Sequence, residues 1–374
     1  MILRNVTTIT GKGTTDIHLK NGKMMPFGEV TPVTLQLDLD GALAFPGLVN
    51  SHDHLDFNLF PQLGDKIYHN YTEWGDYIHA KYKKEINAVL KVPLPLRVSW
   101  GIFKNLLCGV TTVVNHGEHL AIKDAPINVE QGHSIHSVQF EKLWKLKLNN
   151  PLKRGLPAVI HVGEGVDELA HTEIDQLNSW NLLRKELIGI HGIAMSEEQA
   201  KYFKALIWCP ESNYFMFNKT AKIDQLKKHT TILFGTDSTL TGNWNIWDHI
   251  RLARKTNMLT DAELYSAVHL GGTTSWTTDA ANQDTIVITK RKPDTDAFES
   301  FYTNDPADVL LVVHHDCIRL FDASLLAQLG QIDLGKFSKV YIGGSCKFIE
   351  GDLPGLMRQI KTYYPEAVFP VSAN

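Results

Sequence analysis

The chain has 374 residues, and its 37 basic and 41 acidic side chains give it a formal net charge of −4. This balance leaves no basic stripe of the kind that binds a phosphate backbone, so we expect no nucleic-acid partner. No apolar run approaches the roughly 20 residues that cross a membrane, and the first residues, MILRNVTTIT, lack the apolar core of a signal peptide. The sequence therefore predicts a cytoplasmic globular protein with no membrane partner.

The cysteines carry little functional information. Cys108, Cys209, Cys317 and Cys346 are widely spaced and form no CxxC pair. We expect them to be buried free thiols in a reducing compartment.

The pattern of residues changes twice along the chain. Up to residue 45, short alternating segments are separated by the turn-forming stretches NGK and DLDG. From residue 46, apolar strands alternate with amphipathic helices, which is typical of βα units and a parallel sheet. Strand-like segments return after about residue 285. We predict an α/β fold with a TIM-like (β/α)8 barrel over residues 46–285 and a small β-sandwich domain built from residues 1–45 and 286–374, with a C-terminal helix.

Seven barrel strands can be placed from the sequence, whereas a closed barrel needs eight. They are FPGLVNSH, GVTTVVNHG, HSIHSVQF, LPAVIHVGE, LIGIHGIAM, ALIWCP and TTILFGTDS. We expect the eighth strand between residues 137 and 157. Helices are expected at LRVSWGIFKNLL, EIDQLNSWNLLRKE, SEEQAKYFKA and KIDQLKKH.

The stretch PGLVNSHDHLDF places two histidines at the end of the first barrel strand. Residues two apart in a strand point to the same face, so His52 and His54 project together. Catalytic groups of barrel enzymes lie at this carboxyl end of the strands. Two buried imidazoles need a partner, and a divalent cation between them meets that need.

Other polar groups follow later strands. His161 ends one strand with Glu164 three residues beyond, His191 ends the next, and Asp237 ends the last. The 109 residues from His52 to His161 leave room for four βα units. This spacing assigns the four groups of ligand-type residues to strands one, five, six and eight, at one end of one barrel.

Taken in order, five motifs resemble the amidohydrolase superfamily. They are PGLVNSHDH, HVGEGVDE, GIHGIAMSEE, WCPESNYFMF and FGTDS. The resemblance covers essentially residues 1–345 and is greatest to the branch that contains cytosine deaminase, guanine deaminase and triazine hydrolase.

The resemblance also implies roles for individual residues. One Zn²⁺ or Fe²⁺ would be bound by His52, His54, His161 and Asp237. Glu164 would take the place of the proton-shuttling glutamate, and His191 that of the histidine that hydrogen-bonds the attacking water or the tetrahedral intermediate. Relatives with two metals often use a carboxylated lysine on the fourth strand; Lys142, Lys145 and Lys147 lie instead in a helix-like segment, so we expect one metal.

These residues favour hydrolysis. A cation in such a site can lower the pKa of a water molecule to about 7, Glu164 can transfer its proton, and His191 and Asp237 can stabilise developing charge. We predict a metal-dependent hydrolase of non-peptide C–N bonds that deaminates an aminated nitrogen heterocycle. Hydrolysis of an amide, imine or carbon–chlorine bond on the same scaffold, and a non-catalytic metal-holding barrel, stay as alternatives.

Substrate contacts are less well defined by the sequence. Four residues are candidates: His116, which ends a strand, His136, which lies in one, and Ser212 and Asn213, which follow another. Of His133 and His136, at most one can face the barrel mouth. The aromatic segment 57–74 is expected to be a substrate-covering loop. The small-molecule substrate, the metal's identity and a homo-oligomeric state stay open.

Overall fold

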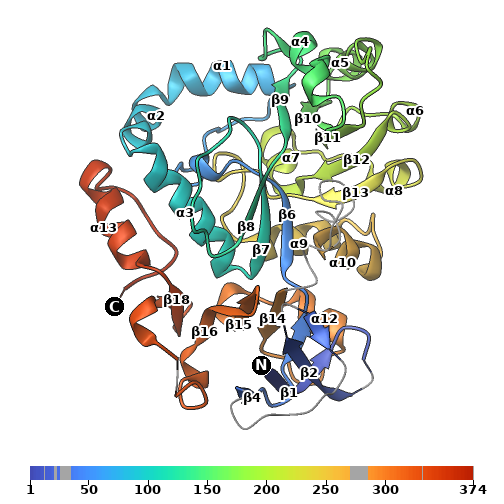
Figure 1. Ribbon diagram of the computed structural model, residues 1–374. Coiled ribbons are helices and arrows are strands. Elements are labelled where there is room, and N and C mark those ends of the chain that lie inside the picture. Colours follow the sequence, from blue (N-terminus) through green and yellow to red (C-terminus); the bar gives the residue numbers. More distant parts are fainter. Residues whose placement is uncertain (12, 21–22, 26–34, 270–284, 331, 374) are drawn as a thin grey trace.

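The computed structural model describes residues 1–11, 13–20, 23–25, 35–269, 285–330 and 332–373. Their strands form two parallel sheets, of three and five strands, and one ten-stranded sheet. Figure 1 shows the parallel strands in the middle of the molecule and the ten-stranded sheet below them.

All strand pairs in the two smaller sheets are parallel. The three-stranded sheet has the order β6 (Leu48–Asp53), β7 (Val110–Asn115) and β8 (Asn128–Gln131). The five-stranded sheet has the order β13 (Thr231–Phe234), β12 (Phe203–Trp208), β11 (Leu187–His191), β10 (Ala158–Val162) and β9 (His133–Ser137). Every residue of β6, β7, β10 and β11 is buried, as expected for strands covered on both faces.

The two parallel sheets approach each other at their edges. β8 and β9 are separated only by residue 132, and they pair with β7 and β10 respectively. At the other end, the backbone N–H groups of Thr236 and Asp237 donate to the carbonyl oxygen of His52, at 3.2 and 3.0 Å. A Cβ on Gly235 would lie 2.7 Å from the Cβ of His52, so glycine is needed for this approach.

The prediction of an eighth strand between residues 137 and 157 is wrong. That segment holds α4 (Trp144–Leu148) and the short 3₁₀ helix Pro151–Lys153. The assignment of His161, His191 and Asp237 to strands five, six and eight nevertheless agrees with the structure, because β10, β11 and β13 are the fifth, sixth and eighth parallel strands in chain order. The strand that the sequence did not reveal is β8, which lies directly before β9. The first crossover of the parallel strands, from β6 to β7, carries three helices, α1 (Tyr71–Lys81), α2 (Lys83–Leu90) and α3 (Leu94–Leu107).

The helices also differ from the sequence prediction in extent. α1 begins inside the segment expected to be a loop, with the Asn70 side chain accepting hydrogen bonds from the backbone N–H groups of Thr72 and Glu73. Three of the four expected helices end earlier than predicted, as α5 (Glu168–Ser179), α6 (Glu197–Ala200) and α8 (Ile223–Leu226). The others are α7 (Pro210–Phe217), α9 (Ile246–Lys255), α10 (Asp261–His269), α12 (Ala297–Tyr302) and α13 (Leu353–Tyr363).

The ten-stranded sheet combines the two ends of the chain. Its order is β17-β18-β16-β15-β14-β5-β1-β2-β3, with β4 paired to β1. The first half supplies β1 (Ile2–Thr8), β2 (Thr14–Lys20), β3 (Lys23–Met25), β4 (Gln36–Asp38) and β5 (Leu43–Phe45). The second half supplies β14 (Thr285–Thr289), β15 (Val309–His314), β16 (Cys317–Asp322), β17 (Phe337–Ile342) and β18 (Ser345–Glu350). The antiparallel pair β14–β5 joins the halves.

Two smaller expectations can be compared with the structure. All four cysteines are free, but Cys317 is exposed at a strand start, so the expectation that every thiol is buried is wrong. In the described part of the chain, each helix is too short or too polar to traverse a bilayer.

Candidate metal centre and active site

The Nε2 atoms of three histidines converge at one end of the parallel strands. His161 Nε2 lies 3.2 Å from His52 Nε2 and 3.4 Å from His54 Nε2. Asp237 Oδ1 lies 3.6 and 3.7 Å from the same two atoms of His52 and His54. β6 carries His52 and ends one residue before His54, β10 carries His161, and Asp237 follows β13. The four predicted ligands are therefore brought together, and we call these four side chains the metal cluster.

These separations fit a divalent cation. Four ligands at about 2.0–2.2 Å from a tetrahedral centre lie roughly 3.4 Å apart. Burial, followed by the charge of His52, lowers the pKa of His54 to about 3, and burial also holds the pKa of His161 well below its usual range. His54 and His161 therefore favour their neutral form, in which a ring nitrogen can bind a metal cation. This donor set can hold Zn²⁺ or another divalent metal.

Hydrogen bonds behind the cluster orient its members. The Nδ1–H of His161 donates to the carbonyl oxygen of His136 at 2.8 Å, which leaves Nε2 with a free lone pair. Asp237 Oδ2 accepts hydrogen bonds from Ser212 Oγ at 2.9 Å and from Thr241 Oγ1 at 3.0 Å. Burial opposes ionisation of Asp237, but the neighbouring histidines, His52 foremost, keep its pKa well below the ordinary value. The carboxylate is thus held ionised, with Oδ1 facing the imidazoles.

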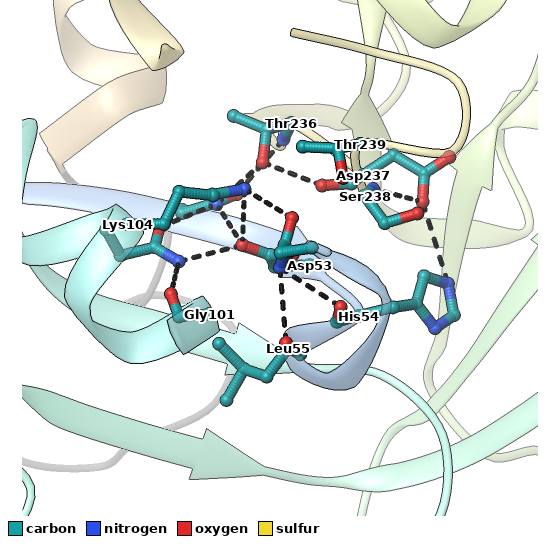
Figure 2. Close-up of polar contacts among 12 residues, drawn as sticks. Asp53, His54, Leu55, Gly101, Lys104, Thr236, Asp237, Ser238 and Thr239 are labelled. Atoms are coloured by element: carbon teal, nitrogen blue, oxygen red, sulfur yellow. Dashed lines mark hydrogen bonds and ion pairs between the residues drawn. The ribbon is translucent and has the colours of Figure 1, made fainter. Parts of the chain in front are cut away.

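A buried polar network centred on Asp53 supports the two histidines on either side of it (Figure 2). Its carboxylate accepts hydrogen bonds from Asn58 Nδ2 at 2.8 Å, Asn105 Nδ2 at 2.8 Å and Asn50 Nδ2 at 3.2 Å. The Lys104 ammonium lies 3.0 Å from Asp53 Oδ2, and both side chains are almost fully buried. Lys104, on α3, therefore neutralises the negative charge of Asp53 next to the metal cluster.

The same network reaches the segment that carries Asp237. Asn50 Nδ2 donates to Thr236 Oγ1 at 2.8 Å, and the Thr236 backbone N–H donates to Asn50 Oδ1 at 3.0 Å. Figure 2 shows Thr236 between Lys104 and Asp237. Our sequence analysis missed this network. A lysine and an asparagine inside the apolar stretch IFKNLL of α3 were its one visible sign.

Glu164 and His191 lie beside the metal cluster, as predicted. His191 Nε2 is 3.5 Å from Glu164 Oε1, and the Nδ1–H of His191 donates to Asn213 Oδ1 at 2.8 Å. Burial, assisted by the charge of Asp237, raises the pKa of Glu164 well above its ordinary value. Burial also lowers the pKa of His191 to about 4. The pair therefore places a carboxylate that is a stronger base than usual next to a neutral imidazole.

A second buried glutamate supports the turn that carries Glu164. Glu173 Oε1 accepts a hydrogen bond from the backbone N–H of Gly163 at 2.9 Å, and Oε2 accepts one from the Tyr71 hydroxyl at 2.9 Å. Burial raises the pKa of Glu173 to about 7 in spite of these hydrogen bonds. Gly163 has a φ of +62°, which glycine adopts without strain. Glu173 thus connects α1 with the turn between His161 and Glu164.

A cavity of about 540 Å³ opens onto these groups. Of the predicted site residues, it is lined by His54, His136, His161, Glu164, His191 and Asp237. Helices α1 and α2 contribute part of its wall, and Figure 1 places them on the side of the parallel strands away from the ten-stranded sheet. The segment expected to cover the substrate does contribute Phe57, Phe60, Tyr71 and Trp74 to the lining, although its last residues are helical.

The other candidate substrate contacts have different surroundings. His136 lines the cavity, whereas His133 is buried against Lys185, with 2.6 Å between His133 Nδ1 and Lys185 Nζ, so at most one of this pair faces the cavity, as expected. His116 is buried behind the cluster, with its ring centroid 4.5 Å from that of His161. Ser212 and Asn213 hydrogen-bond Asp237 and His191 and do not line the cavity. These two side chains therefore orient Asp237 and His191.

Comparisons with known proteins agree on the fold. No protein-family model matches the chain. A stretch of 117 residues is 31% identical to imidazolonepropionase of Kosmotoga olearia, but it spans only 29% of that protein and 29% of this chain. Over 310 residues the chain is 22% identical to 5-methylthioadenosine/S-adenosylhomocysteine deaminase of Pyrococcus furiosus, covering 65% of this chain and 72% of that protein.

Solved structures extend the likeness to the whole chain. A zinc-bound adenosine deaminase from Xanthomonas campestris superimposes with a TM-score of 0.69 at 15% identity, covering 98% of both chains. Guanine deaminase from C. acetobutylicum, with bound guanine, superimposes with a TM-score of 0.61 at 13% identity, covering 85% of this chain and 99% of that one. The chain has the fold of the metal-dependent amidohydrolase superfamily, as its motifs predicted.

The Lys104–Asp53 pair generates a prediction about stability. Lys104→Met should lower the free energy of unfolding by about 3–5 kcal/mol, because it leaves a buried carboxylate without its cation. Adding Asp53→Asn should restore part of that loss. Urea denaturation of the metal-free proteins measures both changes in stability. Lys84→Met, at an exposed position, is the control and should stay within about 0.5 kcal/mol of wild type. Equal stabilities of Lys104→Met and the control would contradict this account.

Glu173 generates a prediction about pH. Its pKa is raised from 4.5 to about 7, so its ionised form is the less stable one in the folded protein and stability falls as pH rises between these values. Glu173→Gln, which mimics the protonated form, should exceed wild type by up to about 3 kcal/mol at pH 8 and match it near pH 4.5. Denaturation across this range tests it, with the exposed Glu168→Gln in the same helix as the control. A difference that does not change with pH argues against burial of an ionisable group here.

Proposed function

We propose that the protein is a metal-dependent hydrolase of non-peptide C–N bonds, and that its reaction is the deamination of an aminated nitrogen heterocycle. One observation carries the proposal. Glu164 and His191 line the same cavity as His54, His161 and Asp237, with 3.5 Å between the reactive atoms of the first two. A purely structural metal site needs no proton-transfer group beside it, so this arrangement argues against a non-catalytic metal-holding barrel.

One divalent cation would be held by His52, His54, His161 and Asp237, and we propose Zn²⁺, with Fe²⁺ as the alternative. A cation in this site would supply a water molecule whose pKa is lowered to about 7. The second-metal lysine of some relatives has no counterpart at the site, since Lys142, Lys145 and Lys147 do not line the cavity. We therefore propose a single metal.

The side chains divide the remaining chemistry between them. Because His191 donates its Nδ1–H to Asn213, its Nε2 can accept a hydrogen bond from the attacking water and orient it. Glu164 accepts a proton from that water and delivers it to the leaving nitrogen. A carbon–oxygen bond forms, the carbon–nitrogen bond breaks, and ammonia leaves. The buried Asp237 carboxylate keeps its charge throughout.

The comparisons support this reaction class by the activities that the relatives' names describe, which include deamination of adenosine and of guanine. A zinc-bound atrazine chlorohydrolase from Arthrobacter aurescens TC1 also shares the fold, with a TM-score of 0.63 at 15% identity over 85% of this chain and 94% of that one. Displacement of chloride, like hydrolysis of an amide or imine, is thus the alternative, and measuring ammonia separates it from deamination.

We further propose the setting in which this chemistry operates. The two parallel sheets would act as one (β/α)8-like barrel over residues 46–285, with a β-sandwich domain formed by residues 1–45 and 286–374. The substrate would be a small molecule, and the protein would act in the cytoplasm without a nucleic-acid or membrane partner. It could also form a homo-oligomer. The pairing of β14 with β5 supports the joining of the two chain ends.

Replacing the proton carrier tests the proposed function. Glu164→Gln should lower kcat at least about 100-fold while one metal per chain stays bound, because a general acid–base group contributes about 10²–10⁴-fold. Ammonia release from aminated purines, pyrimidines, pterins and triazines gives the activity, and elemental analysis gives the metal content. Glu168→Gln is the matched control, four residues away and exposed. Wild-type turnover by Glu164→Gln would remove Glu164 from the mechanism.

A further inference from the structure

Beyond the metal cluster, the cavity is lined mainly by apolar and aromatic side chains. Near the metal end, the Phe57 ring stacks on that of His54, with 5.5 Å between centroids and 20° between planes. Farther residues are supplied by α1 and α2, which contribute Trp74, Ile78, Ile86 and Leu90. The cavity therefore has a polar end, where the reaction takes place, and an apolar end against the two helices.

The polar atoms of the aromatic lining are already engaged. The Trp74 indole N–H donates to the carbonyl oxygen of Leu63 at 2.7 Å, and the Tyr71 hydroxyl donates to Glu173. Their rings are thus left to contact a ligand through carbon. In the described part of the chain, no lysine or arginine lines this cavity. A phosphate or carboxylate on the substrate would find no cation to pair with except at the metal.

The mouth of the cavity is also apolar. Leu90 and Phe140 line it while 47% and 44% exposed, which leaves large hydrophobic side chains partly in water. The polar residues of this region that line the cavity, Asp76 and His79, lie on the exposed face of α1. Apolar surface at the rim of a cavity with a few convergent polar groups is typical of a site that buries an apolar ligand.

The volume of the cavity is consistent with an apolar ligand. Ligand sites of roughly 300–1,000 Å³ hold molecules of drug size. The cavity measures about 540 Å³, so a bare aminated ring at the metal end would leave the apolar end to water. Burying an apolar substituent there would release that water and gain binding energy.

We propose that the substrate is an uncharged aminated heterocycle that carries an extended apolar arm, and that this arm lies along α1 and α2 between Phe57 and Leu90. The inference rests on the proposed function, since the reacting ring is placed at the metal end. It adds the apolar arm of the substrate, which cannot be inferred from the metal cluster and Glu164.

Matched ligands test the arm. Aminated purine, pyrimidine and triazine rings are each prepared with a methyl, n-hexyl, 5-carboxypentyl or 6-aminohexyl arm, and their Kd values are measured by calorimetry on the metal-loaded Glu164→Gln protein. On at least one ring, n-hexyl should bind about tenfold or more tighter than methyl, since two buried methylene groups supply about that factor. Either charged arm should bind more weakly than n-hexyl. Absence of the n-hexyl gain on all rings, or an equally tight charged arm, overturns the proposal.

A matched pair of leucines locates the arm. Leu90 lines the cavity at 47% exposure, whereas Leu94 is 43% exposed and does not line it. Leu90→Glu, made in the Glu164→Gln protein, should weaken n-hexyl binding by about threefold or more and leave the methyl ligand unchanged. Leu94→Glu should change neither. Equal effects of the two substitutions on n-hexyl binding overturn the placement of the arm.

Ammonia release by the wild-type enzyme separates this inference from the proposed function. Faster turnover of n-hexyl than of methyl rings supports both. Ammonia from methyl and n-hexyl rings at equal kcat/KM, without tighter n-hexyl binding, overturns the apolar arm and leaves deamination in place. Tight n-hexyl binding without ammonia from any ring overturns deamination and leaves the preference of the cavity for an apolar arm.

Discussion

Three imidazole nitrogens and a carboxylate oxygen meet in a nearly dry pocket, with separations of 3.2–3.7 Å. Three imidazole nitrogens and a carboxylate oxygen at these separations form a donor set that fits a divalent cation. The fold brings these four ligands together. β6, β10 and the segment after β13 end at the same side of the parallel sheets, and each delivers ligands there.

The cluster is held from behind by groups that never reach the substrate. Asp53, between the two histidines of β6, is fixed by Lys104 and three asparagines, and one of these, Asn50, continues to the segment of Asp237. Burying this ion pair is costly, and its many hydrogen bonds offset the cost. What it contributes is the position of two ligand-bearing segments relative to each other, which a metal site needs to within a few tenths of an ångström.

The sequence revealed the metal cluster because its residues follow recognisable apolar strands, and period two places His52 and His54 on one face. It did not reveal the position of one strand, β8. β8 is short and only one residue separates it from β9, so the eighth strand was expected in the segment 137–157, where the structure has α4 instead. It also could not reveal that Ser212 and Asn213 orient other side chains, because the distance that decides this is between residues far apart in the chain.

X-ray absorption at the zinc edge, on full-length protein loaded with one equivalent of Zn²⁺, tests the central claim most directly. The account predicts a single four- or five-coordinate site with three imidazole nitrogens and one or two oxygens at about 2.0–2.2 Å. Sulfur ligation, or zinc spread over weak sites with fewer than two imidazoles, would contradict the convergence of His52, His54, His161 and Asp237 on one ion.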